Sequence, residues 1–185
     1  MIPYRFVEPI VTERLTLRLM TEADVDDVHA YQSRADVAEY MLYEPRTRDE
    51  VAEKVARNAV ADTLENDDDF IQLALDLDGR VIGELYFTIT KAAQSGAEIG
   101  WSLHPDFAGH GYASEAARAV LDLGFGKLRL HRVIAELDPR NAASIALCKR
   151  LGMREEAYFV EDLDFKGAWA DTGIYAILER EWRIR

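Results

Sequence analysis

The sequence has little cysteine and no clustered histidine, and both are common metal ligands. The single Cys148 has no partner for a disulfide within the chain and no cysteine neighbours that would complete a metal site. The four histidines are scattered without ligand spacing: His29, His104, His110 and His131. We therefore expect no metal.

Long apolar runs and basic stretches are also missing. No apolar run is long enough to span a bilayer, and the first residues lack the charged and apolar blocks of a signal peptide. The formal net charge is -12, which argues against nucleic acid as a ligand because phosphate binding needs a basic surface. We expect a cytoplasmic protein without membrane contact. Its acidity serves solubility or favours amine and basic-peptide partners.

The composition suits one domain. A chain of 185 residues with 49% hydrophobic residues can bury a full core, and it shows no internal repeat, low-complexity tract or linker. We predict a single mixed α/β domain over residues 1–185.

Hydrophobic periodicity predicts seven strands and four helices. The predicted strands are 12–19, 70–77, 81–90, 97–103, 131–137, 154–163 and 173–181. The predicted helices are 22–34, 48–65, one that carries residues 113–124, and 142–151. Asp78-Gly79 indicates a hairpin, so the strands between 70 and 103 form an antiparallel meander. The aromatic connection Tyr40 to Tyr43 lines a pocket or covers the core.

A glycine turn at Gly109 and Gly111 leads from a strand into a helix with a small, apolar face. The first turn of a helix has unpaired N–H groups and a positive dipole end, so this loop can hold a pyrophosphate. It can equally be an ordinary strand-to-helix turn. A dinucleotide-binding turn is disfavoured, because the loop follows a meander and no acidic ribose partner comes after it at the expected distance.

Two strings, AEIGWSLHPDFAGHGYASEA and DPRNAASIALCKRLGM, closely resemble the GCN5-related N-acetyltransferase (GNAT) superfamily, within it the RimJ/RimL-like branch. The resemblance implies a single domain with a mostly antiparallel, seven-stranded mixed sheet flanked by about four helices, and an acyl-CoA-binding core at approximately residues 97–152. It also implies acetyl-CoA as cofactor. The acceptor would be an amine, on a small molecule or a protein N-terminus, and the protein a monomer or homodimer.

The family's acyl-CoA signature, Gln/Arg-x-x-Gly-x-Gly/Ala, falls on residues 108–113, with Ala108 as the one departure. The resemblance implies that this loop holds the pyrophosphate and that the pantetheine lies between the strands 99–103 and 131–137. The implied cofactor-binding residues are Trp101, Ser102, Leu103, Ala108, Gly109, His110, Gly111, Tyr112, Ala113, Asn141 and Ser144.

Three residues are candidates for the chemistry. Asn141 and Ser144 match the branch's N-x-x-S motif; they either cap a helix or act as ligands, with Ser144 as proton donor to the departing thiolate. Many relatives place a tyrosine acid where this chain has Cys148, which is expected to be buried and inert. Glu98 is the preferred general base and Glu84 the reserve. The alternatives are a non-catalytic acyl-CoA-binding or sensing module and a nucleotide-binding module.

Overall fold

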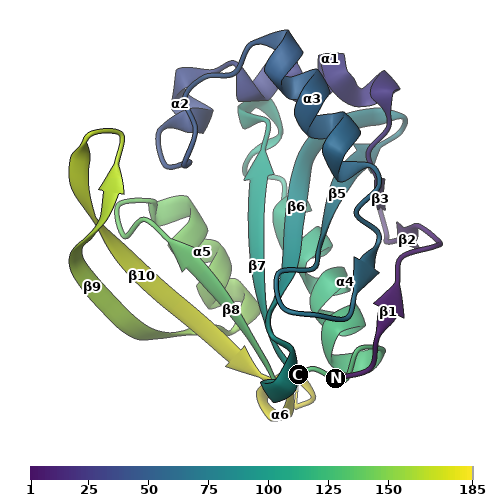
Figure 1. Ribbon diagram of the computed structural model, residues 1–185, viewed down its shortest axis with the longest axis vertical. Coiled ribbons are helices and arrows are strands. Elements are labelled where there is room, and N and C mark those ends of the chain that lie inside the picture. The colour runs from purple at the N-terminus through teal and green to yellow at the C-terminus, as the bar shows by residue number, and fades with distance from the viewer. Residues whose placement is uncertain (185) are drawn as a thin grey trace.

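The computed structural model describes residues 1–184 and has an eight-stranded sheet in the order β2-β3-β5-β6-β7-β8-β10-β9 (Figure 1). The strands are β1 (Tyr4–Arg5), β2 (Ile10–Val11), β3 (Thr16–Leu19), β4 (Thr63–Leu64), β5 (Phe70–Leu77), β6 (Arg80–Lys91), β7 (Gly96–Leu103), β8 (Arg132–Leu137), β9 (Arg154–Phe165) and β10 (Ala168–Leu178). The α-helices are α1 (Val25–Gln32), α2 (Ala35–Ala38), α3 (Arg48–Asn58), α4 (Tyr112–Gly126), α5 (Ala142–Leu151) and α6 (Glu179–Trp182).

The sheet is mixed and mostly antiparallel, as predicted: only β7 and β8 pair in parallel. The strand count differs from the predicted seven, because β2 adds an eighth strand and β1 pairs with β4 in a separate ribbon. Two-residue strands show no alternation, so periodicity does not reveal them. The four longer helices match the four predicted ones, while α2 and α6 have four residues each.

Three predicted boundaries are corrected. The predicted helix 48–65 ends at Asn58, because Thr63–Leu64 extends to pair with β1. The predicted helix 22–34 begins with a 3-10 turn, Glu22–Asp24, and becomes α-helical only at Val25. The last strand runs Ala168–Leu178, and the chain then turns into α6. Each boundary depends on long-range pairing or on a short turn that local patterns do not encode.

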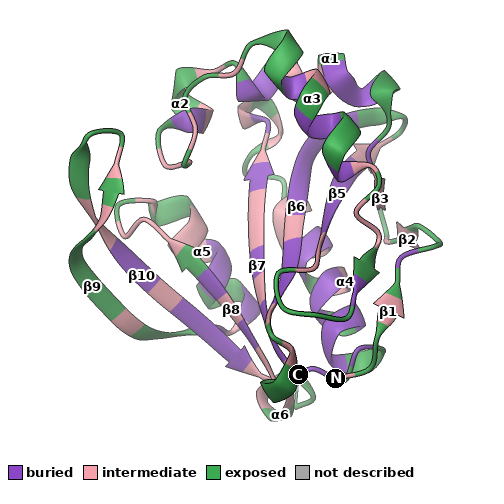
Figure 2. Ribbon diagram, viewed as in Figure 1, coloured by how far each residue is buried: buried purple, intermediate pink, exposed green. Residues whose placement is uncertain are grey.

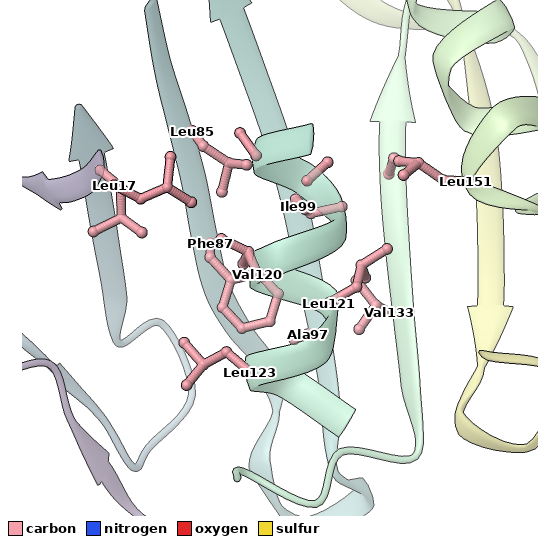
Figure 3. Close-up of a cluster of buried hydrophobic side chains, with 14 of the residues drawn as sticks. Leu17, Leu85, Phe87, Ala97, Ile99, Val120, Leu121, Leu123, Val133 and Leu151 are labelled. Atoms are coloured by element: carbon pink, nitrogen blue, oxygen red, sulfur yellow. The ribbon is translucent and has the colours of Figure 1, made fainter. Parts of the chain in front are cut away.

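The main core lies between the sheet and α4 (Figure 2). Val120, Leu121 and Leu123 pack against Phe87 and other sheet residues (Figure 3). Gly124 belongs to this small face, since a Cβ there would lie 3.2 Å from the Phe87 ring. A second cluster packs α1 and α3 against the opposite face of the sheet, because its Ala74 alternates along β5 with Leu73 and Leu75 of the main core. No helix within residues 1–184 is long and apolar enough to cross a membrane.

The two parallel strands separate soon after they meet. Only Gly96–Glu98 of β7 pairs with Arg132–Ile134 of β8, and Figure 1 shows the strands diverging beyond that point. The splay implied by the resemblance is therefore present. It leaves a wedge between β7 and β8.

Candidate active site

A cavity of about 470 Å³ opens beside the wedge. Its walls come from β5, β6, β7, β8, α3, the start of α5 and the connection after α2. The connection contributes Tyr40, Met41, Leu42, Tyr43 and Arg46, so the pocket-lining interpretation of this aromatic segment is confirmed. The candidate residues Glu84, Glu98, Trp101, Ser102, Asn141 and Ser144 line the same cavity. The fold thus gathers residues spread over a hundred positions.

The edge of β7 presents free backbone groups to the wedge. His104 donates its N–H to Ile82 of β6 (2.8 Å), whereas Ser95 accepts a hydrogen bond from the N–H of His131 (2.8 Å), just ahead of β8. Because successive residues of a strand point their polar groups to opposite sides, the odd-numbered residues of β7 face β8. Past Glu98 no partner strand remains. The N–H and C=O groups of Trp101 and Leu103 therefore face the wedge, whereas the N–H of Ile99 is still engaged by the last pairing of β7 with β8.

The glycine loop forms a row of unpaired donors at the start of α4. Gly109 and Gly111 have φ values of +81° and +85°, and Gly111 is the N-cap of the helix. Within residues 1–184, none of the backbone N–H groups of residues 109–114 donates to the protein. Ala108 differs, since its N–H donates to the carbonyl of Pro105 (3.0 Å). The donor row suits an anion, because it coincides with the positive end of the helix dipole.

Arg14 holds this loop in place, and the sequence reading missed it. Its Nη1 donates to the carbonyl of His110 (2.9 Å), and its guanidinium lies 4.5 Å from the centroid of the Tyr112 ring. The same guanidinium forms an ion pair with Glu115 (2.7 Å), which also accepts from the hydroxyl of Thr12 (2.6 Å). The only signal in the sequence is the position of Arg14 in the opening TERLTLR, far from the loop.

Trp101 connects β7 to the start of α5. Its Nε1–H donates to the Oγ of Ser144 (3.1 Å), and Asn141 caps the helix by accepting from the N–H of Ser144 (3.0 Å). The capping interpretation of Asn141 is confirmed, and its amide still lines the cavity. Since Ser144 accepts from Trp101, its own hydroxyl hydrogen remains available. Cys148 is buried, and burial raises its pKa to about 12, so it is an inert thiol.

Glu98 lies on the sheet face opposite α4, beside the wedge. Burial and the nearby carboxylate of Glu136 raise its pKa to about 7. No ion pair joins Glu98 to a cation of residues 1–184. Sequence reasoning missed Glu136, although strand alternation places it on the same face as Glu98. A half-buried carboxyl group with a pKa near neutrality is suited to exchange a proton at that pH.

Glu84 has a different environment. It is 5% exposed, forms an ion pair with Lys54 and accepts a hydrogen bond from Nε2 of Gln32 (2.8 Å). Burial lowers the pKa of Lys54. Both oxygens of Glu84 are engaged, so it positions other groups more readily than it takes up a proton. Within residues 1–184, no three His, Cys, Asp or Glu side chains form a metal-binding group.

Comparison with known proteins identifies this arrangement. A family model described as an acetyltransferase (GNAT) domain matches residues 14–154. The uncharacterized N-acetyltransferase YnaD of Bacillus subtilis (strain 168) is 34% identical over 176 residues, covering 94% of this chain and 98% of that protein. The crystal structure of a GNAT-family acetyltransferase from Bacillus anthracis has a TM-score of 0.84 at 34% identity and covers 94% of this chain and 99% of its own.

Two more distant structures share the fold and contain CoA. RimL, a ribosomal L7/L12 α-N-protein acetyltransferase in complex with CoA, has a TM-score of 0.80 at 19% identity, with 92% of this chain and 98% of its own covered. Spermidine N-acetyltransferase from Vibrio cholerae, in complex with CoA and spermine, has a TM-score of 0.75 at 22% identity and the same coverage. At these identities the likeness concerns the fold.

Proposed function

The chain belongs to the GNAT family of acetyltransferases, and from this premise we propose that it transfers an acetyl group from acetyl-CoA to a primary amine. The observation that carries the proposal is the wedge between β7 and β8, with the donor row of residues 109–114 at its open end. The amine belongs to a small molecule or a protein N-terminus, and it attacks the thioester directly.

The residues present fit the cofactor. The N–H groups of residues 109–114 would hold the pyrophosphate, and Arg14 keeps their loop in shape. Trp101 and Leu103 of β7 offer free backbone groups to an extended chain, so the pantetheine would pair with them like an added strand. Asn141 presents its amide to the same space. When bound, acetyl-CoA supplies an acetyl group activated as a thioester.

The catalytic roles follow from the positions of three residues. Glu98 accepts the proton of the attacking amine, directly or through water, because its pKa of about 7 lets it exchange protons near neutral pH. A backbone N–H of β7 facing the wedge, such as that of Trp101, stabilises the oxyanion. Ser144, oriented by Trp101, donates a proton to the departing thiolate. Glu84 stays paired with Lys54 and supports the wall of the site.

Thiol release from acetyl-CoA tests the proposal, with amines and N-terminal peptides as acceptors. We expect turnover on at least one amine, and calorimetry should detect binding of CoA but not of ATP or NAD. CoA binding without turnover on any amine would favour a sensing module. ATP or NAD affinity that competes with CoA would favour a nucleotide-binding module, and absence of CoA binding would overturn the assignment.

A further inference from the structure

Two cationic side chains, Arg46 and Lys54, line the active-site cavity together with the carboxylate of Glu84. Lys54 is buried and pairs with Glu84, so these two charges compensate each other. Arg46 lines the cavity and makes no ion pair with a carboxylate of residues 1–184. The end of the cavity that they line therefore carries one uncompensated positive charge.

Arg46 is held in a fixed orientation by α1 and by its own loop. Its backbone N–H donates to the backbone carbonyl of Gln32 (2.9 Å), and its Nη1 donates to Oε1 of the Gln32 side chain (2.7 Å). The guanidinium lies 3.9 Å from the centroid of the Tyr43 ring. Because a guanidinium has five N–H donors, most of them remain free for a ligand. A positioned arginine with free donors is suited to a planar anion such as a carboxylate.

Tyr43 adds a second unused group at the same end. Its hydroxyl is buried near Ser102 and makes no hydrogen bond of good geometry within residues 1–184, although the side chain lines the cavity. Burial raises its pKa to about 12, so the hydroxyl keeps its proton and can donate it in a hydrogen bond. A buried polar group without a partner is costly, and a ligand oxygen there would satisfy it.

The acidic end of the cavity lies apart from the end that Arg46 and Tyr43 form. Glu84 pairs in register with Ser102, whereas Glu98 pairs with Thr88, four residues further along the sheet. At about 3.3 Å per residue, the two positions are roughly 13 Å apart along the strands. Glu98 and Glu136 form the acidic end, and Arg46 and Tyr43 form the opposite one. The cavity is therefore polarised.

We propose that the acceptor is a small amino-carboxylate, whose carboxylate is bound by Arg46 and the Tyr43 hydroxyl while its amine lies at the wedge beside Trp101 and passes its proton to Glu98 through water. This inference rests on the proposed acetyl transfer and defines its acceptor. A purely cationic amine would leave the positive charge of Arg46 uncompensated and the Tyr43 hydroxyl unpaired. A protein N-terminus has no α-carboxylate to offer them, because its first carboxyl group is part of a peptide bond.

Matched acceptors test the proposal. Leucine, methionine, β-alanine and γ-aminobutyrate are each compared with their own carboxamide, and spermidine serves as a purely cationic amine. Hydrogen bonds to a charged group are worth about 1.5–3 kcal/mol, so kcat/KM for the preferred carboxylate should exceed that of its carboxamide about 10- to 100-fold. Equal or better turnover of the carboxamides or of spermidine would overturn the proposal while leaving acetyl transfer established.

Variants of Arg46 test whether this residue causes the preference for a carboxylate acceptor. Arg46→Gln should raise KM for the carboxylate about 10- to 100-fold and leave KM for the carboxamide and the affinity for CoA unchanged. Arg46→Lys should restore part of the affinity, because it retains the charge without the planar fork. Arg48→Gln is the matched control: Arg48 is exposed and pairs with Asp26 outside the cavity. If Arg46→Gln raised KM equally for the carboxylate and for the carboxamide, the proposal would be contradicted.

A binding measurement keeps the two hypotheses distinct. Calorimetry on the CoA-loaded protein compares N-acetylleucine with N-acetylleucinamide, which needs no turnover. Tighter binding of the carboxylate, lost in Arg46→Gln, supports the amino-carboxylate site even where no amine is acetylated. Equal affinities would refute the site, whereas failure of CoA itself to bind would refute the proposed function.

Discussion

Glu98 and Glu84 are two glutamates on the same sheet face whose surroundings give them different chemistry. Glu98 is partly buried and has another carboxylate, Glu136, as its charged neighbour, so ionisation becomes harder and its pKa rises to about 7. Glu84 faces Lys54 and Gln32, which stabilise its charge and occupy its oxygens. The first can exchange a proton near neutral pH, and the second is an anchor.

The pH dependence of turnover should report Glu98. A base with a pKa of about 7 is ionised above that pH, so kcat/KM should rise through pH 7 and level off above it. Glu98→Gln should lower kcat/KM about 100-fold or more and remove this acidic limb. Stopped assays of thiol release over pH 5.5 to 9 measure both.

Glu136→Gln provides the control for this assignment. Removing the neighbouring charge makes ionisation of Glu98 easier. The midpoint of the rise in kcat/KM should therefore move to lower pH, while the plateau value of kcat/KM at high pH stays the same. An acidic limb that persists unchanged in Glu98→Gln would place the base elsewhere, and Glu84→Gln would be the next variant to profile.

At the scale of elements, α4 serves two purposes. Its small, apolar face allows the helix to lie close to the sheet, and its N-terminus carries the loop of unpaired N–H groups. Arg14, which precedes β3, reaches across to the carbonyl of His110 and fixes the loop's shape. A pyrophosphate cradle made of backbone depends on that shape more than on any side chain.

Gly111→Val should weaken CoA binding about 5- to 30-fold. Gly111 has φ +85°, and a left-handed conformation costs other residues about 1–2 kcal/mol, so valine would either strain the loop or reshape its donor row. Calorimetry with CoA measures the change. Gly126→Ala, at the exposed far end of α4 with open space around it, should leave the affinity unaltered. Unchanged affinity in Gly111→Val would assign the loop another role.

At the scale of the whole molecule, one buried ion pair joins the helical layer to the sheet. Lys54 comes from α3 and Glu84 from β6, and Gln32 of α1 bonds to the same carboxylate. With their side chains 9% and 6% exposed, both charges are shielded from water. Each partner compensates a charge that would be costly to bury alone.

Lys54→Met should lower the free energy of unfolding by about 3–5 kcal/mol, because it leaves the charge of Glu84 buried without its partner. Combining it with Glu84→Gln should recover much of the loss. Urea denaturation of the two variants measures this difference. Arg48→Gln, which breaks an exposed ion pair with Asp26, should change stability by no more than about 0.5 kcal/mol. If Lys54→Met alone had the same free energy of unfolding as the double variant, the buried charge of Glu84 would not be the cause of the loss.

The sequence by itself determined the features encoded locally. Alternation in Phe70–Leu77 and the small face of α4 predict the meander and the helix behind the glycine turn, because periodicity of 2 or 3.6 residues reflects which side is buried. Thr47 and Glu50 form a capping box at the start of α3, and their T-x-x-E spacing is visible in the sequence. The family resemblance rests on such local strings, and the family model confirms it.

Only the tertiary structure decided which side chains meet. Arg14 contacts a loop about a hundred positions away in the sequence. Glu98 lies beside Glu136. The guanidinium of Arg46 is held in position by its hydrogen bond to the Gln32 side chain. The pairing of β1 with β4 likewise joins segments too short to show a pattern. Charge and hydrogen-bond environments arise from packing between distant segments, so a local pattern predicts that a glutamate is present but not whether it acts as base or anchor.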